Sequence, residues 1–209
     1  MNTTMNFGLK DKKRILVVFT AVILMGFSLS FLIRVNLGTD PCSYMNLAVA
    51  AKLGISFGTW QFLLNAILFI FVILFDRSHI GWGTLANMVC MGYAADFFGW
   101  LFNFILPADA FSNWVIRIAV LIPSLTLLIF SAAVYMSVAL GSAPYDATVF
   151  IIASKLKRIP FRVIRMSWDI TACIIGFALT GAIGLVTIIM AFTLGIVISW
   201  VKDRIYKFF

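Results

Sequence analysis

Two stretches of this sequence repeat the same pattern. Residues 36–53 read NLGTDPCSYMNLAVAAKL, and residues 139–156 read ALGSAPYDATVFIIASKL. Each contains Leu-Gly-[Ser/Thr]-x-Pro and ends with Lys-Leu. Proline disrupts a helix interior but is favoured at the first helical position, so each stretch predicts a chain break followed by a short helix. The predicted helices, 42–53 and 145–156, would be about 18 Å long, too short to cross a bilayer. They are either interfacial or re-entrant.

The rest of the chain has the composition of a helical membrane protein. Of its 209 residues, 63% are hydrophobic and only 11% are charged, and the mean hydropathy is +1.06. A water-soluble domain of this size could not cover so much apolar surface. We predict an all-α membrane protein whose apolar runs form six spans near 15–35, 59–75, 82–105, 115–139, 164–180 and 183–201. The first run is too long for a signal peptide, so we interpret it as a retained span.

The repeated pattern belongs to a longer internal similarity. An ungapped comparison of 14–99 with 117–202, at an offset of 103 residues, finds identical residues at 18 of 86 positions. Several are glycine, proline, lysine or arginine, which shared apolar composition does not explain. Each half holds three spans, an odd number, so the second half should be inverted relative to the first. We predict two inverted three-helix repeats, each with a short interfacial or re-entrant helix after its first span.

The basic residues predict the orientation of the chain. Under the six-span arrangement, thirteen of the sixteen lysines and arginines fall on one side, and only Arg34, Lys52 and Arg117 fall on the other. The positive-inside rule then places both termini in the cytoplasm. The predicted organisation is a cytoplasmic N-terminal segment, a first repeat, an external loop, a second repeat and a cytoplasmic tail, at residues 1–13, 14–106, 107–114, 115–202 and 203–209.

Three segments carry a resemblance to a known family. NLGTDP (36–41), GISFGTWQF (54–62) and GWGTLANMVCMGYAADF (81–97) resemble motifs of the YczE/YitT-type bacterial integral membrane proteins. The second half departs from the pattern, because Arg158-Ile159-Pro160-Phe161 stands where the family has a Gly-Ile-x-x-Gly turn. The resemblance implies the fold and a bacterial inner-membrane location, and it suggests a transport or export role.

Polar residues within the predicted spans are the candidate binding residues. Ionisable groups in a membrane are costly unless they are paired or wetted, and they often mark substrate pathways. A second group of candidates comes from the two repeated breaks, where irregular backbone is tolerated only beside protein or a water-filled cavity. The candidates are Arg34, Gly38, Thr39, Asp40, Pro41, Asn65, Asp96, Gly141, Ser142, Pro144, Asp146 and Asp169.

Each candidate also has a purely structural interpretation. Asn65, Asp96 and Asp169 could serve interhelical hydrogen bonding. Asp146 could stabilise the first turn of its helix through the helix dipole. Arg34 is expected to pair with Asp40 or Asp96.

Sequence motifs narrow the function to transport or membrane assembly. The chain has no Walker loop, no GxSxG and no HExxH motif, so we expect no enzyme activity. We also expect no cofactor, no metal site and no nucleic-acid partner. The first hypothesis is a small secondary transporter or exporter of an unknown small molecule, acting between inverted repeats. The alternatives are a non-transporting accessory or assembly protein and a substrate-capture subunit. A homodimer or a partner membrane protein is compatible with all three.

Overall fold

The computed structural model describes residues 9–107 and 109–205. The predicted terminal segments therefore lie partly outside the described residues, at 1–8 and 206–209, as does residue 108 of the predicted external loop. The described residues are helical and contain no β-strand. The α-helices are α1 (Leu9–Val35), α2 (Pro41–Leu53), α3 (Phe57–Phe75), α4 (Trp82–Ala86), α5 (Gly92–Ile105), α6 (Trp114–Ser137), α7 (Pro144–Lys155), α8 (Phe161–Thr180) and α9 (Leu185–Ile205).

Six helical segments are long and apolar enough to cross a membrane. They run over Asp11–Val35, Phe57–Phe75, Trp82–Ile105, Trp114–Ser137, Phe161–Thr180 and Leu185–Ile205, within a few residues of the predicted spans. The third segment joins α4 to α5 through one π-helical stretch, Asn87–Met91. A short 3-10 turn, Arg77–His79, precedes α4.

The outward faces of these helices are strongly apolar. Leu74, Phe104 and Val115 are each 73% exposed, and many other large apolar side chains are exposed on the same segments. Such a surface is unfavourable in water but matches the hydrocarbon of a bilayer. The prediction of a multi-pass helical membrane protein is therefore confirmed.

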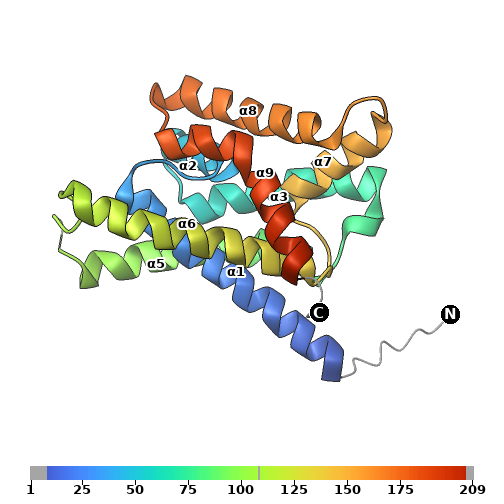
Figure 1. Cartoon of the computed structure of the whole chain (residues 1–209), viewed down its shortest axis with the longest axis horizontal. Coiled ribbons are helices and arrows are strands. Elements are labelled where there is room, and N and C mark those ends of the chain that lie inside the picture. The colour runs from blue at the N-terminus through green and yellow to red at the C-terminus, as the bar shows by residue number, and fades with distance from the viewer. Residues whose placement is uncertain (1–8, 108, 206–209) are drawn as a thin grey trace.

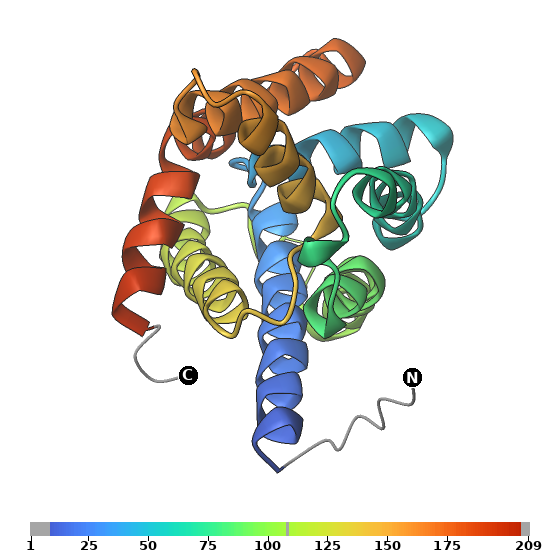
Figure 2. The same cartoon turned by 90° about the vertical axis from the view of Figure 1, so that its right-hand side faces the viewer.

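Helix α1 lies in the middle of the bundle, between α6 on one side and α5 on the other (Figures 1 and 2). Helix α9 packs on the opposite side of α6. The short helices cross between the halves of the chain, because α2 packs mainly on α8 and α7 packs mainly on α3. Each half therefore supplies helices to the packing surface of the other.

The two short helices start where the sequence predicted. Pro41 and Pro144 occupy their first turns. Asp40 caps α2, with its carboxylate accepting from Ser43 N at 3.0 Å. The equivalent position before α7 is Ala143, which provides no side-chain cap. The contrast follows from side-chain chemistry, because aspartate accepts a hydrogen bond from the first helical turn and alanine cannot.

Two tight junctions hold the halves together, and they match at the 103-residue offset. In the first, Val186 N donates to Leu37 O at 3.1 Å. In the second, Gly83 N donates to Leu140 O at 2.7 Å. Residues 37 and 83 become 140 and 186 when 103 is added, so the partners are exchanged between the halves. We call these contacts the Gly38 junction and the Gly141 junction, after the glycine that follows each leucine whose carbonyl oxygen accepts the bond.

Both named glycines are required by backbone geometry. Gly38 has φ +117° and Gly141 has φ +104°, a region that side chains disfavour. A Cβ on Gly38 would lie 2.7 Å from Thr187 N, and one on Gly141 would lie 2.6 Å from Gly81 N. The close approach of two backbones therefore excludes any side chain at either junction.

A pair of arginines repeats the same exchange. Arg14 donates to Val138 O at the end of α6, and Arg117 donates to Val35 O at the end of α1, at 2.8 Å. Arginine at a helix C-terminus satisfies free carbonyls and favours the helix dipole. Here each arginine stabilises the end of the corresponding helix in the other half.

Candidate functional site

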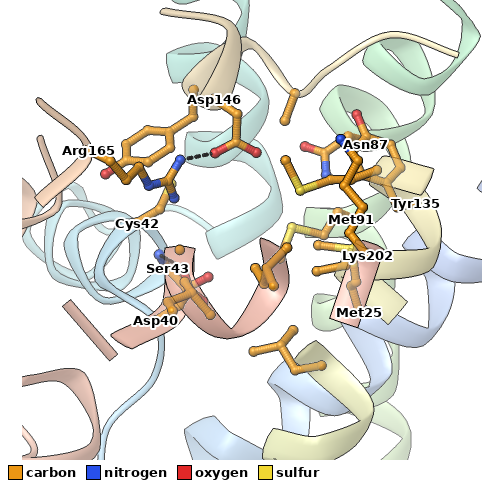
Figure 3. Close-up of a pocket in the computed structure, with 18 of the residues that line it drawn as sticks. Met25, Asp40, Cys42, Ser43, Asn87, Met91, Tyr135, Asp146, Arg165 and Lys202 are labelled. Carbon is orange, nitrogen blue, oxygen red and sulfur yellow. Dashed lines mark hydrogen bonds and ion pairs between the residues drawn. The ribbon is translucent and has the colours of Figure 1, made fainter. Parts of the chain in front are cut away.

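A cavity of about 210 Å³ lies inside the bundle (Figure 3). Both halves line it, and the first turns of α2 and α7 reach it through Asp40, Ser43, Tyr145 and Asp146. Its lining continues to Lys202, near the C-terminal end of α9. The two chain breaks found in the sequence therefore converge on one cavity.

The charged part of this cavity is built around Arg165 of α8. Its Nε donates to Asp169 Oδ2 at 3.0 Å, one helical turn later, and its Nη1 pairs with Asp146 Oδ1 from the first turn of α7. Tyr145 OH donates to the other oxygen of Asp169 at 3.0 Å. Burial raises the pKa of Tyr145 well above its ordinary value, which keeps the phenol protonated as a donor. We call Tyr145, Asp146 and Arg165 the paired set.

Asp169 lies behind the cavity lining. Its side chain is 2% exposed, and both of its oxygens are bound, one by Arg165 and one by Tyr145. A buried carboxylate with two donors fixes its partners in place. Asp169 therefore contacts two residues that line the cavity and is not itself part of the lining.

A second polar group in the lining comes entirely from the first half. It consists of Asp40, Gln61 and Asn65, which we call the unpaired set. Asp40 Oδ2, Gln61 Oε1 and Asn65 Oδ1 are buried and have no hydrogen-bond partner among the described residues. Gln61 and Asn65 are each 4% exposed. Burial raises the pKa of Asp40, although its bond from Ser43 opposes that rise.

The π-helical stretch of the third span also contributes to the lining. Asn87 and Met91 lie at its two ends and both line the cavity. In Figure 3 they face the cavity from the side opposite Arg165 and Asp146. Single-turn π segments often occur at functional sites, because the extra residue re-aims side chains.

The remaining predicted site residues lie at the helix junctions or away from the cavity. Gly38 and Gly141 form the two junctions, where Thr39 N donates to Thr187 Oγ1 and Ser142 N donates to His79 O. Pro41 and Pro144 are buried at the starts of α2 and α7.

Arg34 and Asp96 do not form the expected pair. Arg34 donates to Gly99 O at 2.7 Å and to Asn103 Oδ1. Asp96 instead accepts from Gly58 N at 2.9 Å, at the start of α3. The prediction of an ion pair from Arg34 to Asp40 or Asp96 is wrong, because α5 brings neutral acceptors closer to the guanidinium.

The ion pairs of Arg165 were not predicted from the sequence. Arg165 was expected among the basic residues of the cytoplasmic side, whereas the structure places it in the ion-pair cluster of α8. Its spacing of four residues from Asp169 was the available signal, because residues at i and i+4 share a helix face. Gln61, Asn87, Tyr145 and Met91 were also absent from the predicted site. Their types are common in helix packing, and only the fold brings them to one cavity.

Comparisons with known proteins identify relatives of uncharacterised function. The chain is 29% identical over 183 residues to "Uncharacterized membrane protein YczE" of Bacillus subtilis, covering 87% of this chain and 82% of the relative. It is 25% identical over 196 residues to an "Uncharacterized protein" of Haemophilus influenzae, covering 93% of this chain and 86% of the relative. No solved structure matches the chain. Residues 12–203 match the family of unknown function DUF6198, and the chain therefore belongs to this YczE-type family of membrane proteins.

Proposed function

We propose that the protein is a small secondary transporter or exporter that binds its substrate in the central cavity. The observation that carries this proposal is the cavity itself, which both halves line and where several buried polar atoms have no partner within residues 9–107 and 109–205. Secondary transporters commonly bind substrates between structural repeats, where helix breaks expose polar backbone and side chains.

The proposal includes an inverted arrangement of the two halves, each with three spans. Its support is the exchange of contacts at the 103-residue offset, seen in the two glycine junctions and in Arg14 and Arg117. For every such contact between the halves, the two residues at the 103-residue offset also contact each other, with the halves exchanged. A two-fold axis between the halves would produce this pattern. The arrival of the first turns of α2 and α7 at the cavity favours re-entrant over interfacial helices.

The proposed orientation has both termini in the cytoplasm of a bacterial inner membrane. The excess of lysine and arginine on that side supports it. Lys202, at the edge of the cavity lining, belongs to the same basic group. In this orientation the cavity described above extends toward the cytoplasm.

An accessory or assembly protein requires no cavity, whereas a substrate-capture subunit requires one that opens on one side only. Alternating access therefore separates these functions. The test is side-specific labelling of Ala132→Cys, which places a thiol on the cavity lining, in a variant whose three native cysteines are replaced. The control is Ala133→Cys, the adjacent position, which is fully buried in the bundle.

We expect a membrane-impermeant thiol reagent to label Ala132→Cys in both right-side-out and inside-out vesicles, and to leave Ala133→Cys unlabelled in both. Labelling of Ala132→Cys from one side only would support a capture subunit. If Ala132→Cys is labelled from neither side, the result would support an accessory protein and would exclude transport through this cavity.

A further inference from the structure

We propose that the cavity binds a small organic cation, a protonated amine with an apolar body, whose N–H groups contact Asp40, Gln61 and Asn65. The inference builds on the proposed function, because it uses the same cavity. It concerns binding alone, so it can be tested without any transport measurement.

The charges around the cavity favour a cation. Asp40, Asp146, Arg165 and Lys202 line the cavity, and Asp169 lies directly behind its lining. The three carboxylates therefore outnumber the two cations. Arg165 pairs with Asp146 and Asp169, while Asp40 makes no ion pair among the described residues. An isolated carboxylate in a poorly solvated site gains stability from a cationic partner. Asp40 is therefore the natural counter-ion of a positively charged ligand.

The hydrogen-bonding capacity of the unpaired set points in the same direction. Its three partnerless atoms, Asp40 Oδ2, Gln61 Oε1 and Asn65 Oδ1, are all acceptors. The amide nitrogen of Gln61 already donates to Met91 Sδ at 2.9 Å. A ligand that donates hydrogen bonds would satisfy these atoms, whereas a carboxylate group has only acceptors to offer. A primary ammonium carries three N–H donors on one centre.

The starts of the two short helices do not favour an anion. A free helix N-terminus attracts negative charge. Here, however, a carboxylate already lies at each start, because Asp40 caps α2 and Asp146 lies in the first turn of α7. The positive ends of both helices are thus balanced by the protein itself.

The remaining lining sets the size and character of the ligand's body. Met25, Met91, Leu128 and Leu194 supply flexible or aliphatic apolar surface. The volume of about 210 Å³ is below the roughly 300–1,000 Å³ of pockets that hold drug-sized ligands. These features suit an amine with a short alkyl chain or one small ring. Methionine side chains adapt to different shapes, so several such amines should bind.

The test measures binding to the purified full chain in detergent by calorimetry. The probes are butylamine, cyclohexylamine, benzylamine and 2-phenylethylamine, each beside the carboxylate that has the same apolar body. We expect at least one amine to bind, and its matching carboxylate to bind at least tenfold more weakly. If no amine binds, or if a carboxylate binds as well as its amine, the inference is wrong.

A second comparison isolates the N–H donors. The N,N,N-trimethyl derivative of the best amine keeps the positive charge but has no N–H group. We expect it to bind about tenfold more weakly, because the acceptors of the unpaired set then remain without partners. Equal binding would show that hydrogen bonding to these residues has no part in recognition.

Asp40→Asn tests the proposed counter-ion. Asparagine is also a good N-cap, so the start of α2 should be preserved while the charge is lost. We expect the amine affinity to fall about 10- to 100-fold. The matched control is Asp76→Asn, the same replacement at an aspartate that caps the exposed 3-10 turn through Ser78 N. It should bind the amine like the parent protein, and equal losses in both variants would overturn the assignment.

Asn65→Leu provides a variant that leaves the α2 cap untouched. We expect the amine affinity to fall by about 2- to 10-fold, the effect of one neutral hydrogen bond. Unchanged affinity in both Asp40→Asn and Asn65→Leu would place the amine outside this cavity. The binding measurements and the labelling experiment test different claims, so the failure of one can be told from the failure of the other. Amine binding without two-sided labelling would refute transport alone, and two-sided labelling without amine binding would refute only the ligand class.

Discussion

The helix junctions of the two halves of the protein are alike, whereas the residues that the two halves contribute to the cavity lining differ. At the Gly38 and Gly141 junctions a Leu-Gly pair in each half makes the same exchanged backbone contact, although the donors, Val186 and Gly83, differ in type. In the cavity, by contrast, the first half contributes the unpaired set and the second half contributes the paired set. The two halves therefore match in their backbone contacts at the junctions, but not in the side chains that line the cavity.

The physical reason lies in what each region must satisfy. Where two backbones touch, only glycine fits, so neither copy of the junction can change without a clash. Side chains that line a cavity have space beside them and can change one at a time. In this cavity the lining residues of the second half satisfy one another through ion pairs, whereas three buried acceptors of the first half have no partner among the described residues.

The largest effect is expected from breaking the paired set. Arg165→Met leaves the carboxylates of Asp146 and Asp169 without their cation. Removal of one partner from a buried ion pair typically lowers the free energy of unfolding by about 3–5 kcal/mol. The measurement is unfolding in mixed detergent micelles. Arg162→Met, an exposed arginine on the same helix, is the control and should have little effect. Equal stability of Arg165→Met and the parent protein would show that this network is not structural.

The next largest effect should come from the junctions. We expect Gly38→Ala and Gly141→Ala each to lower the free energy of unfolding by about 2–4 kcal/mol, through backbone strain and overpacking together. The same unfolding assay applies, and the two losses should be similar because the junctions are equivalent.

Two other glycines separate strain from clash. Gly54 and Gly181 have φ of +68° and +69°, but a Cβ on either would meet nothing within 4 Å. Their alanine variants should lose only about 1 kcal/mol, the conformational part of the effect. If they lose as much stability as the junction variants, close backbone contact is not the reason that Gly38 and Gly141 must be glycine.

The contacts of Arg14 and Arg117 with the opposite half are a third pair of equivalent interactions that can be removed. Arg14→Met and Arg117→Met should each lower the free energy of unfolding by about 1.5–3 kcal/mol, the range for hydrogen bonds from charged groups. Arg117 also donates to Asn36 O at 3.0 Å, so its loss should be the larger of the two. A negligible effect in both variants would mean that these contacts between halves add nothing to stability.

The smallest change in stability is expected in the unpaired set. Asn65→Leu removes a buried acceptor that has no partner, so the free energy of unfolding should stay within about 1 kcal/mol of the parent value or rise slightly. A marked loss of stability would show that Asn65 is a packing residue and would argue against a ligand-binding role.

Much of the fold could be predicted from the sequence because its signals are local. Long apolar runs give the spans, and proline after a small-residue turn gives the starts of α2 and α7. Asp40 before Pro41 even indicates which of the two short helices is capped. These features depend on helix chemistry within one segment, and none requires knowledge of which segments meet.

The site was less predictable because it depends on contacts between distant segments. Arg165 carries the same charge as the loop arginines, and only the approach of α7 shows that it binds Asp146. Arg34 was assigned to the nearest aspartates, although α5 supplies Gly99 and Asn103 as partners. The polar role of Gln61 appears only when α3 and the π-helical stretch are placed side by side.

The most direct test of the account compares Lys52 and Lys155, which are related by the 103-residue offset and lie in the last turns of α2 and α7. Both side chains are exposed. Each would be replaced by cysteine in the variant without native cysteines, and an impermeant maleimide would be applied to intact bacterial cells and then to permeabilised ones. We expect Lys52→Cys to react in intact cells and Lys155→Cys to react only after permeabilisation. Reaction of both positions from the same side would contradict the inverted arrangement and the transport site built on it.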